Sequence, residues 1–536
     1  MATDCLRASA LPHSSRLFTD FLGDFARVEK FYAHPPTMAA AGKLAAKRQI
    51  PSESRRALVE ILREQNREFG ADATVVRSLD RLAAGAAAVV TGQQLGLFGG
   101  PAFSFYKALT AVRVAEELSR GRQDTVPVFW LATEDHDLAE VSHTYFLERT
   151  GELRQLEWTP EGDSAEQPVG PLRLGAGIDG VVERACAVLD GAAAEQVAQA
   201  LRASYQPGAS LGAAFGRLMT RMLAGRGIIL MDAMDARIHR LASPLFAQVA
   251  TAADALNRAL LARGKELEKA HYHVQVKVTE RSTPLFLLEQ GRRMPVHRQK
   301  ESFVAGGKSY SAHELAALAQ EAPERFSPNA LLRPLMQDFL LPTAAYVAGP
   351  AEIAYFAQSH ALYRELAVPM PVILPRAGFT LIEPYVARVM KKYALDLQDM
   401  LGGGQQLRKR LERQFVPAGL DRAFVTGEKQ VRAQLRKLRA PLGKLDKTLL
   451  GARDNSERKM LYQWEKLRAR VGRARDLRSG VLSRHERILR DAMIPHHSLQ
   501  ERILNLLPLL ARNGLGLLDE LQKRATADGN HTIVRL

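Results

Sequence analysis

Residues 86–118 read AAAVVTGQQLGLFGGPAFSFYKALTAVRVAEEL. The small apolar residues that begin this stretch lack the alternation of a half-exposed strand, and they are typical of a strand buried on both faces of a parallel sheet. Four glycines then follow within nine residues and permit a tight turn, after which Pro101 suits the first turn of a helix. The stretch therefore predicts a strand, a turn and a long helix, which is the repeating unit of an α/β fold.

Other short apolar runs bounded by turn residues have the same character. Long helical patterns separate several of them, and this alternation predicts a doubly wound α/β core around a parallel sheet. Tyr272 to Gln299 instead alternates apolar and polar residues, which predicts antiparallel hairpins in an inserted module. The further runs expected to be parallel strands are residues 126–133, 226–234, 344–350 and 370–376.

The length of 536 residues predicts two or three domains. A hydrophobic content of 46% and a charged content of 25% are typical of a soluble globular protein. The chain lacks both a run of about 18 apolar residues and the order of a signal peptide, so we expect a cytoplasmic protein. Cys5 and Cys186 lie far apart and outside any CxxC spacing, which argues against a disulfide framework and a cysteine zinc site.

The net charge of +16 is concentrated in one segment. Residues 429–490 hold 19 Lys and Arg against 6 Asp and Glu, a balance of +13 that leaves +3 for the rest. Apolar residues repeat there at spacings of four and three, which predicts two helices of an antiparallel coiled coil. We expect the turn at Gly451–Glu457 and a kink at Pro441. The two apolar seams are Val431, Leu435, Leu438, Leu442, Leu445 and Leu449, and then Met460, Trp464, Leu467, Val471, Ala474 and Val481.

These patterns divide the chain into a core, a helical arm and a tail. We expect the core over residues 1–380, with the inserted module at about 265–340. The α-helical coiled-coil domain follows over 381–495, and a tail over 496–536 returns to the core.

Two adjacent glutamines, Gln93 and Gln94, follow the first predicted strand. Ligands collect at the carboxyl ends of the strands in an open parallel sheet, so we expect both amides at the mouth of a site. The glycine spacing fits neither GxGxxG nor GxxxxGK[ST], and it supports neither a dinucleotide site nor a P-loop.

The second predicted strand ends in the ionisable run Glu134, Asp135, His136 and Asp137. The structural interpretation is that Asp137 caps a helix, with Glu140 three residues later. It leaves the crowding of the other groups unexplained, and like charges that raise each other's pKa suit proton transfer or amine binding. A metal site of His136, Asp137 and His143 is an alternative, but the seven-residue histidine separation is not a recognised metal spacing. We therefore expect no metal.

A third polar cluster spans the fourth predicted strand. Arg333 and Gln337 share a helix face, and Asp338 follows them. A structural salt bridge of Arg333 with Asp338 or Glu352 is the alternative to a substrate site. Arg376 closes the fifth strand, and its planar guanidinium suits a carboxylate or phosphate. The candidate substrate-binding residues are Gln93, Gln94, Arg333, Gln337, Asp338, Tyr346, Glu352 and Arg376.

With these residues assembled, the chain resembles the bacillithiol biosynthesis cysteine-adding enzymes, the cysteine ligases of low-molecular-weight thiol synthesis. The resemblance implies a Rossmann-like core related to class I aminoacyl-tRNA synthetases, connecting-peptide insertions and a coiled coil used in homodimerisation. It also implies that the carboxyl group of L-cysteine is joined to the amine of glucosaminyl malate, giving bacillithiol through an amide bond. The strings that carry it are VVTGQQLGLFGGPAFSFYKA, VPVFWLATEDHDLAEV, SPNALLRPLMQDFLLPTAAYVAGPAEIAYFAQ, MPVILPRAGFTLIE and HSLQERILN.

The resemblance also suggests roles for the polar residues. Glu134, His136 and Asp137 are the catalytic candidates, because amide formation needs a group that holds an amine and takes its proton. The sequence lacks the HIGH and KMSKS signatures of the synthetases, so ATP or ADP as cofactor rests on the resemblance alone. An adenine nucleotide between coiled coil and core would meet Gln500, Glu501 and Arg502.

Two other classes compete with the ligase. A tRNA-associated protein would use the basic hairpin to grip RNA, but few aromatic residues are interleaved with its charges. A noncatalytic scaffold would leave the ionisable strand ends without a purpose.

Overall fold

The computed structural model describes residues 3–7, 11–12, 14–121, 123–162, 164–401, 407–408, 410–412 and 415–536. The chain divides into two compact units. The first comprises residues 1–149, 153–381 and 501–534, and the second comprises 150–152, 382–500 and 535–536. No helix in the described part of the chain is both long and apolar enough to cross a bilayer.

The first unit is built on a five-stranded parallel sheet. Its strand order is β13-β12-β2-β3-β6, and all its neighbouring strands run parallel. The five apolar runs form these five strands, so the prediction of a parallel sheet is confirmed. The strands are β2 (Ala87–Gln93), β3 (Thr125–Leu131), β6 (Ile229–Asp232), β12 (Thr343–Ala348) and β13 (Val372–Pro375).

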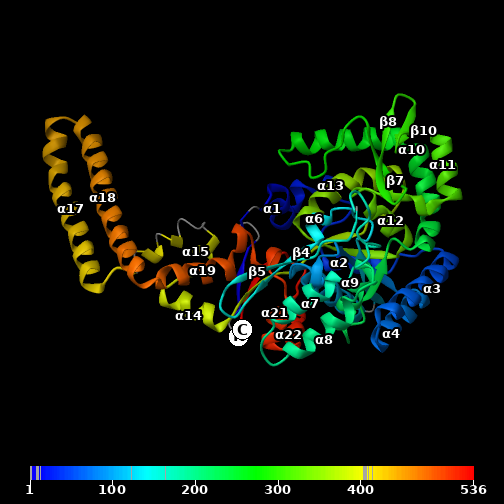
Figure 1. Cartoon of the computed structure of the whole chain (residues 1–536). Helices are drawn as coiled ribbons and strands as arrows, with labels where there is room; N and C mark the ends of the chain where they lie inside the picture. The colour runs from blue at the N-terminus through cyan, green and yellow to red at the C-terminus, as the bar shows by residue number, and fades with distance from the viewer. Residues whose placement is uncertain are drawn as a thin grey trace. The chain divides into compact units, whose positions relative to one another are not determined.

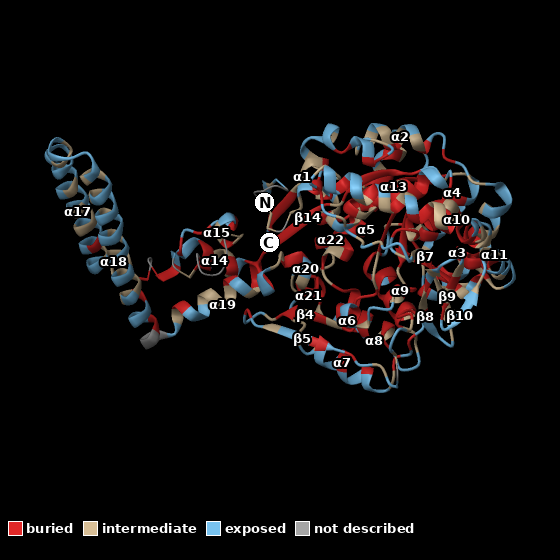
Figure 2. Cartoon of the chain, turned by 90° about the horizontal axis from the view of Figure 1, so that it is seen from above, coloured by how far each residue is buried: buried red, intermediate tan, exposed pale blue. Residues whose placement is uncertain are grey.

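Helices cover both faces of this sheet, as the doubly wound fold requires. Val89 of β2 packs on one face against Ala111 and Val114 of α5 (Phe103–Arg120). Val90 belongs to the larger core on the other face, with α3 (Ser52–Phe69), α10 (Ala236–Lys269) and α13 (Pro350–Glu365). Figure 2 shows much of α5, α10 and α13 in the colour of buried residues. The absence of apolar–polar alternation in the strands follows from this double burial.

The predicted insertion is an antiparallel sheet with the strand order β10-β9-β8-β7-β11. Here β7 (Ser282–Glu289) pairs with β8 (Arg292–Gln299), followed by β9 (Ser302–Ala305), β10 (Lys308–Tyr310) and β11 (Phe326–Pro328). The start of the predicted hairpin was wrong, because residues 272–281 form no strand. The side-chain amide of Gln358 pairs instead with the N–H and the carbonyl of Val276, at 2.8 and 2.9 Å. A side chain thus occupies the place of a neighbouring strand.

The second unit carries a long helical hairpin (Figure 1). Its arms are α17 (Ala418–Leu445) and α18 (Thr448–Ser479), which the indole Nε1 of Trp464 joins by a 2.9 Å hydrogen bond to the carbonyl of Phe424. The predicted turn at Gly451–Glu457 was wrong, because that segment lies inside α18. The chain reverses at Asp446, whose carboxylate accepts the N–H of Thr448 at 2.8 Å. Polar residues need no turn on a helix face that is open to solvent.

Shorter helices also belong to the described part of the second unit. They include α14 (Pro384–Lys392), α15 (Leu397–Leu401) and α19 (Val481–Met493). The second predicted seam is interrupted before its last member, because α18 ends at Gly480 in the left-handed conformation and Val481 begins α19.

The segment 501–534 completes the first unit. The side-chain amide of Asn505 donates to the carbonyl of Phe98 at 2.9 Å, directly beside the turn after β2. Farther on, β15 (His531–Arg535) pairs with β1 (Thr3–Leu6) and lies between β1 and β14 (Gly378–Ile382). The end of the sequence thus helps to build the edge of the core.

Candidate functional site

A cavity of about 780 Å³ opens in the first unit at the carboxyl ends of the parallel strands. One wall comes from the ends of β2, β3 and β12 together with α5 and the start of α13, and another comes from β7 and β8 of the insertion. This volume lies in the range of small-molecule sites. The sequence-predicted residues that line it are Gln93, Gln94, Glu134, His136, Arg333, Tyr346, Glu352, Arg376 and Arg502.

Gly92 lets the strand that carries the two glutamines approach its neighbour closely. A Cβ at this position would lie 2.8 Å from the carbonyl oxygen and 3.0 Å from the Cβ of Trp130 on β3. Gln93 is the last residue of β2, and its Nε2 lies 3.0 Å from Oε1 of Gln94. The side chain of Gln94 reaches the acidic end of the cavity, where Nε2 lies 3.1 Å from Oδ2 of Asp135 and 2.5 Å from Oε2 of Glu140.

Glu134 is the buried member of the acidic run. Its Oε1 lies 3.4 Å from Nε2 of His239, and only 6% of its side chain is exposed. Burial raises the pKa of this carboxyl group, and the nearby His239 and Arg293 oppose that effect. Glu134 can therefore take up a proton more readily than an exposed glutamate.

His136 and Asp137 have different places. Nδ1 of His136 accepts a hydrogen bond from Nη1 of Arg293 at 3.0 Å, and the ring lines the cavity. Asp137 caps α6 (Leu138–Val141) by accepting the N–H of Glu140 at 3.1 Å. It does not line the cavity. The structural interpretation of Asp137 as a helix cap thus describes its contacts.

The metal alternative finds no support in these contacts. Nδ1 of His143 lies 2.9 Å from the carbonyl oxygen of Ala139. In the residues that the structure describes, no three His, Cys, Asp or Glu side chains are grouped so that they could hold a metal ion.

Arg333 is the first residue of α12 (Arg333–Leu340), and its guanidinium lies among neutral acceptors. It donates to Oε1 of Gln337 at 3.1 Å and to the hydroxyls of Tyr346 and Tyr355 at 3.3 and 3.2 Å. Burial raises the pKa of Tyr355 to about 12, so this hydroxyl stays neutral. The shared face of Arg333 and Gln337 is confirmed, whereas the alternative salt bridge to Asp338 or Glu352 is not formed between these described side chains.

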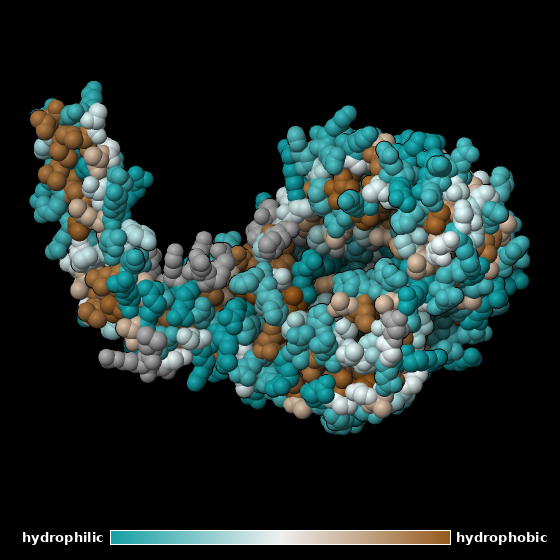
Figure 3. All heavy atoms as spheres, turned by 45° about the horizontal axis from the view of Figure 1, so that its top comes forward, coloured by the Kyte–Doolittle hydropathy of each residue, from teal (hydrophilic) through white to brown (hydrophobic). Residues whose placement is uncertain are grey.

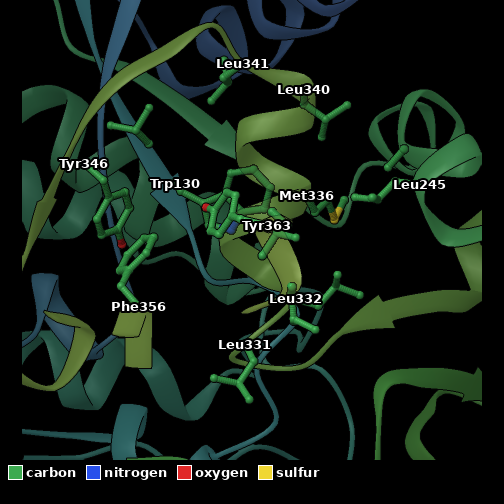
Figure 4. Close-up of a cluster of buried hydrophobic side chains, with 14 of the residues drawn as sticks. Trp130, Leu245, Leu331, Leu332, Met336, Leu340, Leu341, Tyr346, Phe356 and Tyr363 are labelled. Atoms are coloured by element: carbon green, nitrogen blue, oxygen red, sulfur yellow. The ribbon is translucent and has the colours of Figure 1, made fainter. Parts of the chain in front are cut away.

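Packing below the cavity fixes the position of this arginine. Met336 and several leucines of α12 and its flanking residues lie in the buried hydrophobic cluster, as Figure 4 shows. Gln337 and Asp338 are buried on the same helix and do not line the cavity. Gln337 donates to Oδ1 of Asp338 at 2.8 Å, and the hydroxyl of Tyr363 donates to Oδ2. Gln337 therefore accepts a hydrogen bond from Arg333, and Asp338 holds Gln337 in place.

Glu352 has a lysine partner that the sequence analysis missed. Nζ of Lys107 on α5 lies 2.6 Å from Oε2 of Glu352, and only 1% of the lysine side chain is exposed. Burial alone would raise the pKa of Glu352, but Lys107 and the N–H of Gly349 hold it below its ordinary value. Burial likewise lowers the pKa of Lys107, against the effect of Glu352.

Arg376 lines the cavity but is already partly neutralised. Its Nη2 lies 2.6 Å from Oε1 of Glu501, whose Oε2 accepts the N–H of Phe379 at 2.9 Å. Gln500 is buried and donates to the carbonyl of Ala492 at 2.6 Å. Of the three predicted nucleotide-binding residues, Gln500 and Glu501 are not among those that line this cavity. Among them, Arg502 lines the cavity beside the glutamines.

The sequence analysis also missed Arg293, His239 and Tyr355. Arg293 on β8 is buried, stacks on the ring of Phe286 at 4.1 Å and donates to Oγ of Ser327 at 2.9 Å. A lysine within the apolar stretch FSFYKAL was a usable signal for Lys107, because a buried charge needs a partner. No comparable signal identified Arg293. In the sequence, a buried arginine on a hairpin strand looks the same as an exposed one.

Comparison with known proteins gives matches along the whole chain. The family model described as "Bacillithiol biosynthesis BshC, N-terminal Rossmann-like domain" matches residues 1–377, and "Bacillithiol biosynthesis BshC, C-terminal coiled-coil domain" matches residues 379–536. A protein of Koribacter versatilis is 38% identical over 100% of both chains. A Solibacter usitatus protein is 39% identical over 96% of both chains, and a Salinibacter ruber protein is 34% identical over 97% of this chain and 96% of its own. All three carry the name "Putative cysteine ligase BshC".

Proposed function

The chain belongs to the bacillithiol biosynthesis BshC family, and we propose that it is the ligase that joins the carboxyl group of L-cysteine to the amine of glucosaminyl malate. The family membership confirms the resemblance recognised in the sequence motifs. The relatives' shared name supports a cysteine ligase that forms a carbon–nitrogen bond.

The observation that supports this proposal most strongly is the polarity of the cavity. Carboxylates gather at the end of β3, with Arg293 and Arg502 nearby, whereas Arg333 and Arg376 line other parts of the cavity. A diacid such as malate needs cations, and the planar guanidinium binds carboxylates in two-point contacts. An amine needs acceptors and a base instead. The cavity thus offers arginines to the carboxylates of the substrate and carboxylates to its amine.

Formation of the amide bond requires a base at the acidic end of the cavity. A base first removes a proton from the ammonium group. The free amine nitrogen then attacks the activated carboxyl carbon of cysteine, and the carbon–oxygen bond to the activating group breaks, so that this group leaves with the carboxyl oxygen. Glu134 suits the base, because burial raises the pKa of its carboxyl group. His136 borders the same space, and Arg293 holds its ring. Asp137 contributes through the helix cap that positions Glu140.

A nucleotide is the proposed source of carboxyl activation. ATP would supply the leaving group, and Arg502 is the residue of the predicted nucleotide set that fits its phosphates, because it lines the cavity. Glu501 does not fit that role, since it is a buried carboxylate engaged with Arg376.

The hairpin surface supports a homodimer. Most of the large hydrophobic side chains that are exposed in the described residues lie on α17 and α18, as Figure 3 shows for the hairpin. Along α17, Leu435 and Leu442 are half-buried, but Leu438 and Leu445 of the same predicted seam are exposed. The apolar stripe is thus wider than the hairpin itself covers, and a second chain would cover the rest. The exposed residues on the hairpin are Leu420, Val425, Leu438, Leu445, Met460, Tyr462 and Leu467.

A reconstituted assay tests the ligase. Purified protein, L-cysteine, glucosaminyl malate and ATP should give a product with the mass of bacillithiol, and cells that lack the gene should accumulate glucosaminyl malate. Normal bacillithiol in those cells would reject the proposal. Binding of tRNA in gel shifts that weakens steeply between low and moderate salt would favour the tRNA-associated alternative instead.

A further inference from the structure

We propose that Lys107 is a positioning residue that acts on the acidic end of the cavity through two glutamine amides. Those amides belong to Gln93 and Gln94, and the carboxylates that they hold, Asp135 and Glu140, receive the acceptor amine. This inference rests on the proposed function and adds to it the groups that bind the amine before its proton is removed.

The residues form one continuous chain of hydrogen bonds. Nζ of Lys107 lies 3.2 Å from Oε1 of Gln93, and Nε2 of Gln93 lies 3.0 Å from Oε1 of Gln94. Nε2 of Gln94 then donates to both carboxylates, at 3.1 Å to Asp135 and 2.5 Å to Glu140. This chain of hydrogen bonds runs along the lining of the cavity from α5 to the loop after β3.

The groups at the two ends of this series of hydrogen bonds determine which way each bond points. An ammonium group only donates hydrogen bonds, and an ionised carboxylate only accepts them. The carbonyl oxygen of Gln93 must therefore face Lys107, and the amide nitrogen of Gln94 must face the carboxylates. An inverted amide would place nitrogen against Nζ or oxygen against a carboxylate. Lys107 at one end and the two carboxylates at the other thus set the orientation of both amides, which their own shape leaves open.

Lys107 itself is held so firmly that it cannot serve a ligand directly. Its Nζ also contacts the carbonyl of Gly92 and Oε2 of Glu352, so three protein acceptors use its three N–H groups. Water cannot replace them at a side chain that is 1% exposed. The lysine therefore acts through Gln93.

The neighbouring acids are engaged in other ways. Glu134 lies beside His239 and Arg293, and Asp137 caps α6. Asp135 uses Oδ1 for the N–H of His136 at 2.7 Å and keeps Oδ2 on the side of Gln94. Glu140 contacts Gln94 through Oε2 alone. Asp135 and Glu140 thus border the cavity, and the side-chain hydrogen-bond donor that they share is the neutral amide of Gln94 rather than a fixed cation.

An ammonium group would complete this arrangement. Burial and the charges of Asp135 and Asp137 raise the pKa of Glu140, whereas Gln94 and the nearby Arg502 lower it. Loss of the Gln94 hydrogen bond should therefore raise this pKa further and extend the protonated form of Glu140 to higher pH. A protonated Glu140 would attract an ammonium group less strongly.

The test is a double-mutant cycle of Lys107→Met and Gln94→Met on the full-length chain, with the titration of the Glu140 carboxyl carbon followed by NMR. Each single variant should move that titration to higher pH. In the Gln94→Met background, Lys107→Met should add no shift, because the connection is already broken. Equal and additive shifts would show a direct charge effect of Lys107 and overturn the proposal.

Activity supplies the second measurement. In folded Lys107→Met, kcat/KM for glucosaminyl malate should fall about 10-fold to 100-fold, the scale of a misplaced catalytic geometry, and the acidic limb of its pH profile should move upward. Gln93→Leu removes the same connection without removing a charge, and it should reproduce both effects even if Lys107→Met fails to fold. Gln199→Leu, which removes an exposed glutamine bonded to Glu195, is the matched control.

The two proposals fail in distinguishable ways. An inactive wild-type protein whose Glu140 titration still follows the cycle would reject the ligase and retain the positioning role. An active wild-type protein whose Gln93→Leu variant keeps both the titration and the pH profile would retain the ligase and overturn the positioning role.

Discussion

Oε1 of Glu501 lies 2.6 Å from Nη2 of Arg376, although 125 residues separate them in the sequence. Their side chains are 2% and 8% exposed, so this is a buried ion pair within the first unit. It joins the end of β13 to the segment that follows the helical arm. Arg376, the residue that the sequence favoured most for binding an anion, therefore already has Glu501 as an ion-pair partner.

Removal of Glu501 should destabilise the protein strongly. Glu501→Ala leaves Arg376 as an uncompensated buried charge, and we expect a loss of about 3–5 kcal/mol in the free energy of unfolding, measured by urea denaturation. Glu183→Ala, which removes an exposed ion pair with Arg202, is the control and should change little. A Glu501→Ala variant as stable as this control would contradict the buried pair.

The same pair predicts a dependence on pH. Burial alone would raise the pKa of Glu501, but Arg376 and His531 hold it below its ordinary value. A carboxyl group with a lowered folded pKa stabilises the protein above the unfolded pKa of about 4.3, and this contribution is lost as the pH falls through the folded value. The slope of unfolding free energy between about pH 3 and pH 5 should thus be smaller in Glu501→Gln than in wild type.

Asp137 and Glu134 should differ in activity assays. Asparagine caps helices as well as aspartate does, so Asp137→Asn should keep activity within about twofold of wild type. Glu134→Gln should lose about 10²–10⁴-fold in kcat, the scale of a general base. Steady-state kinetics of the ligation measures both. Full activity in both Glu134→Gln and His136→Ala would remove the acidic run from the catalytic assignment.

Gly92 should tolerate no side chain. A Cβ there would lie 2.8 Å from the backbone oxygen of Trp130, and we expect Gly92→Ala to cost about 1–3 kcal/mol of unfolding free energy. Gly177→Ala is the matched control, because nothing lies within 4 Å of its Cβ position at the start of α7 (Gly177–Cys186). Similar denaturation midpoints for the two variants would contradict the close approach of β2 and β3.

The exposed stripe on the hairpin should control the oligomeric state. Leu445→Glu places a charge where the side chain is 79% exposed and should convert a dimer into monomers in light scattering. Val76→Glu alters a 44% exposed hydrophobic residue outside the hairpin and should leave the mass unchanged. A wild-type protein that is monomeric at all concentrations would refute the dimer itself.

The sequence alone determined the five parallel strands and the two long helices. Strands buried on both faces require continuous apolar runs, and paired helices require spacings of four and three, so both signals are local. The position of the turn in the hairpin could not be predicted in the same way. A polar segment such as Gly451–Glu457 looks the same in a turn and on a solvated helix face, whereas Asp446 forms the actual reversal.

The candidate site was also predicted only in part from the sequence. Because strand ends converge at one edge of a parallel sheet, the sequence could place Gln93, Glu134 and Tyr346 at a common cavity. Only the tertiary structure decided which partner each charge has: Lys107 for Glu352, and Glu501 for Arg376. Local periodicity is encoded within a few residues. A buried charge finds its partner through packing between segments more than 100 residues apart, and a single sequence does not indicate which segments will meet.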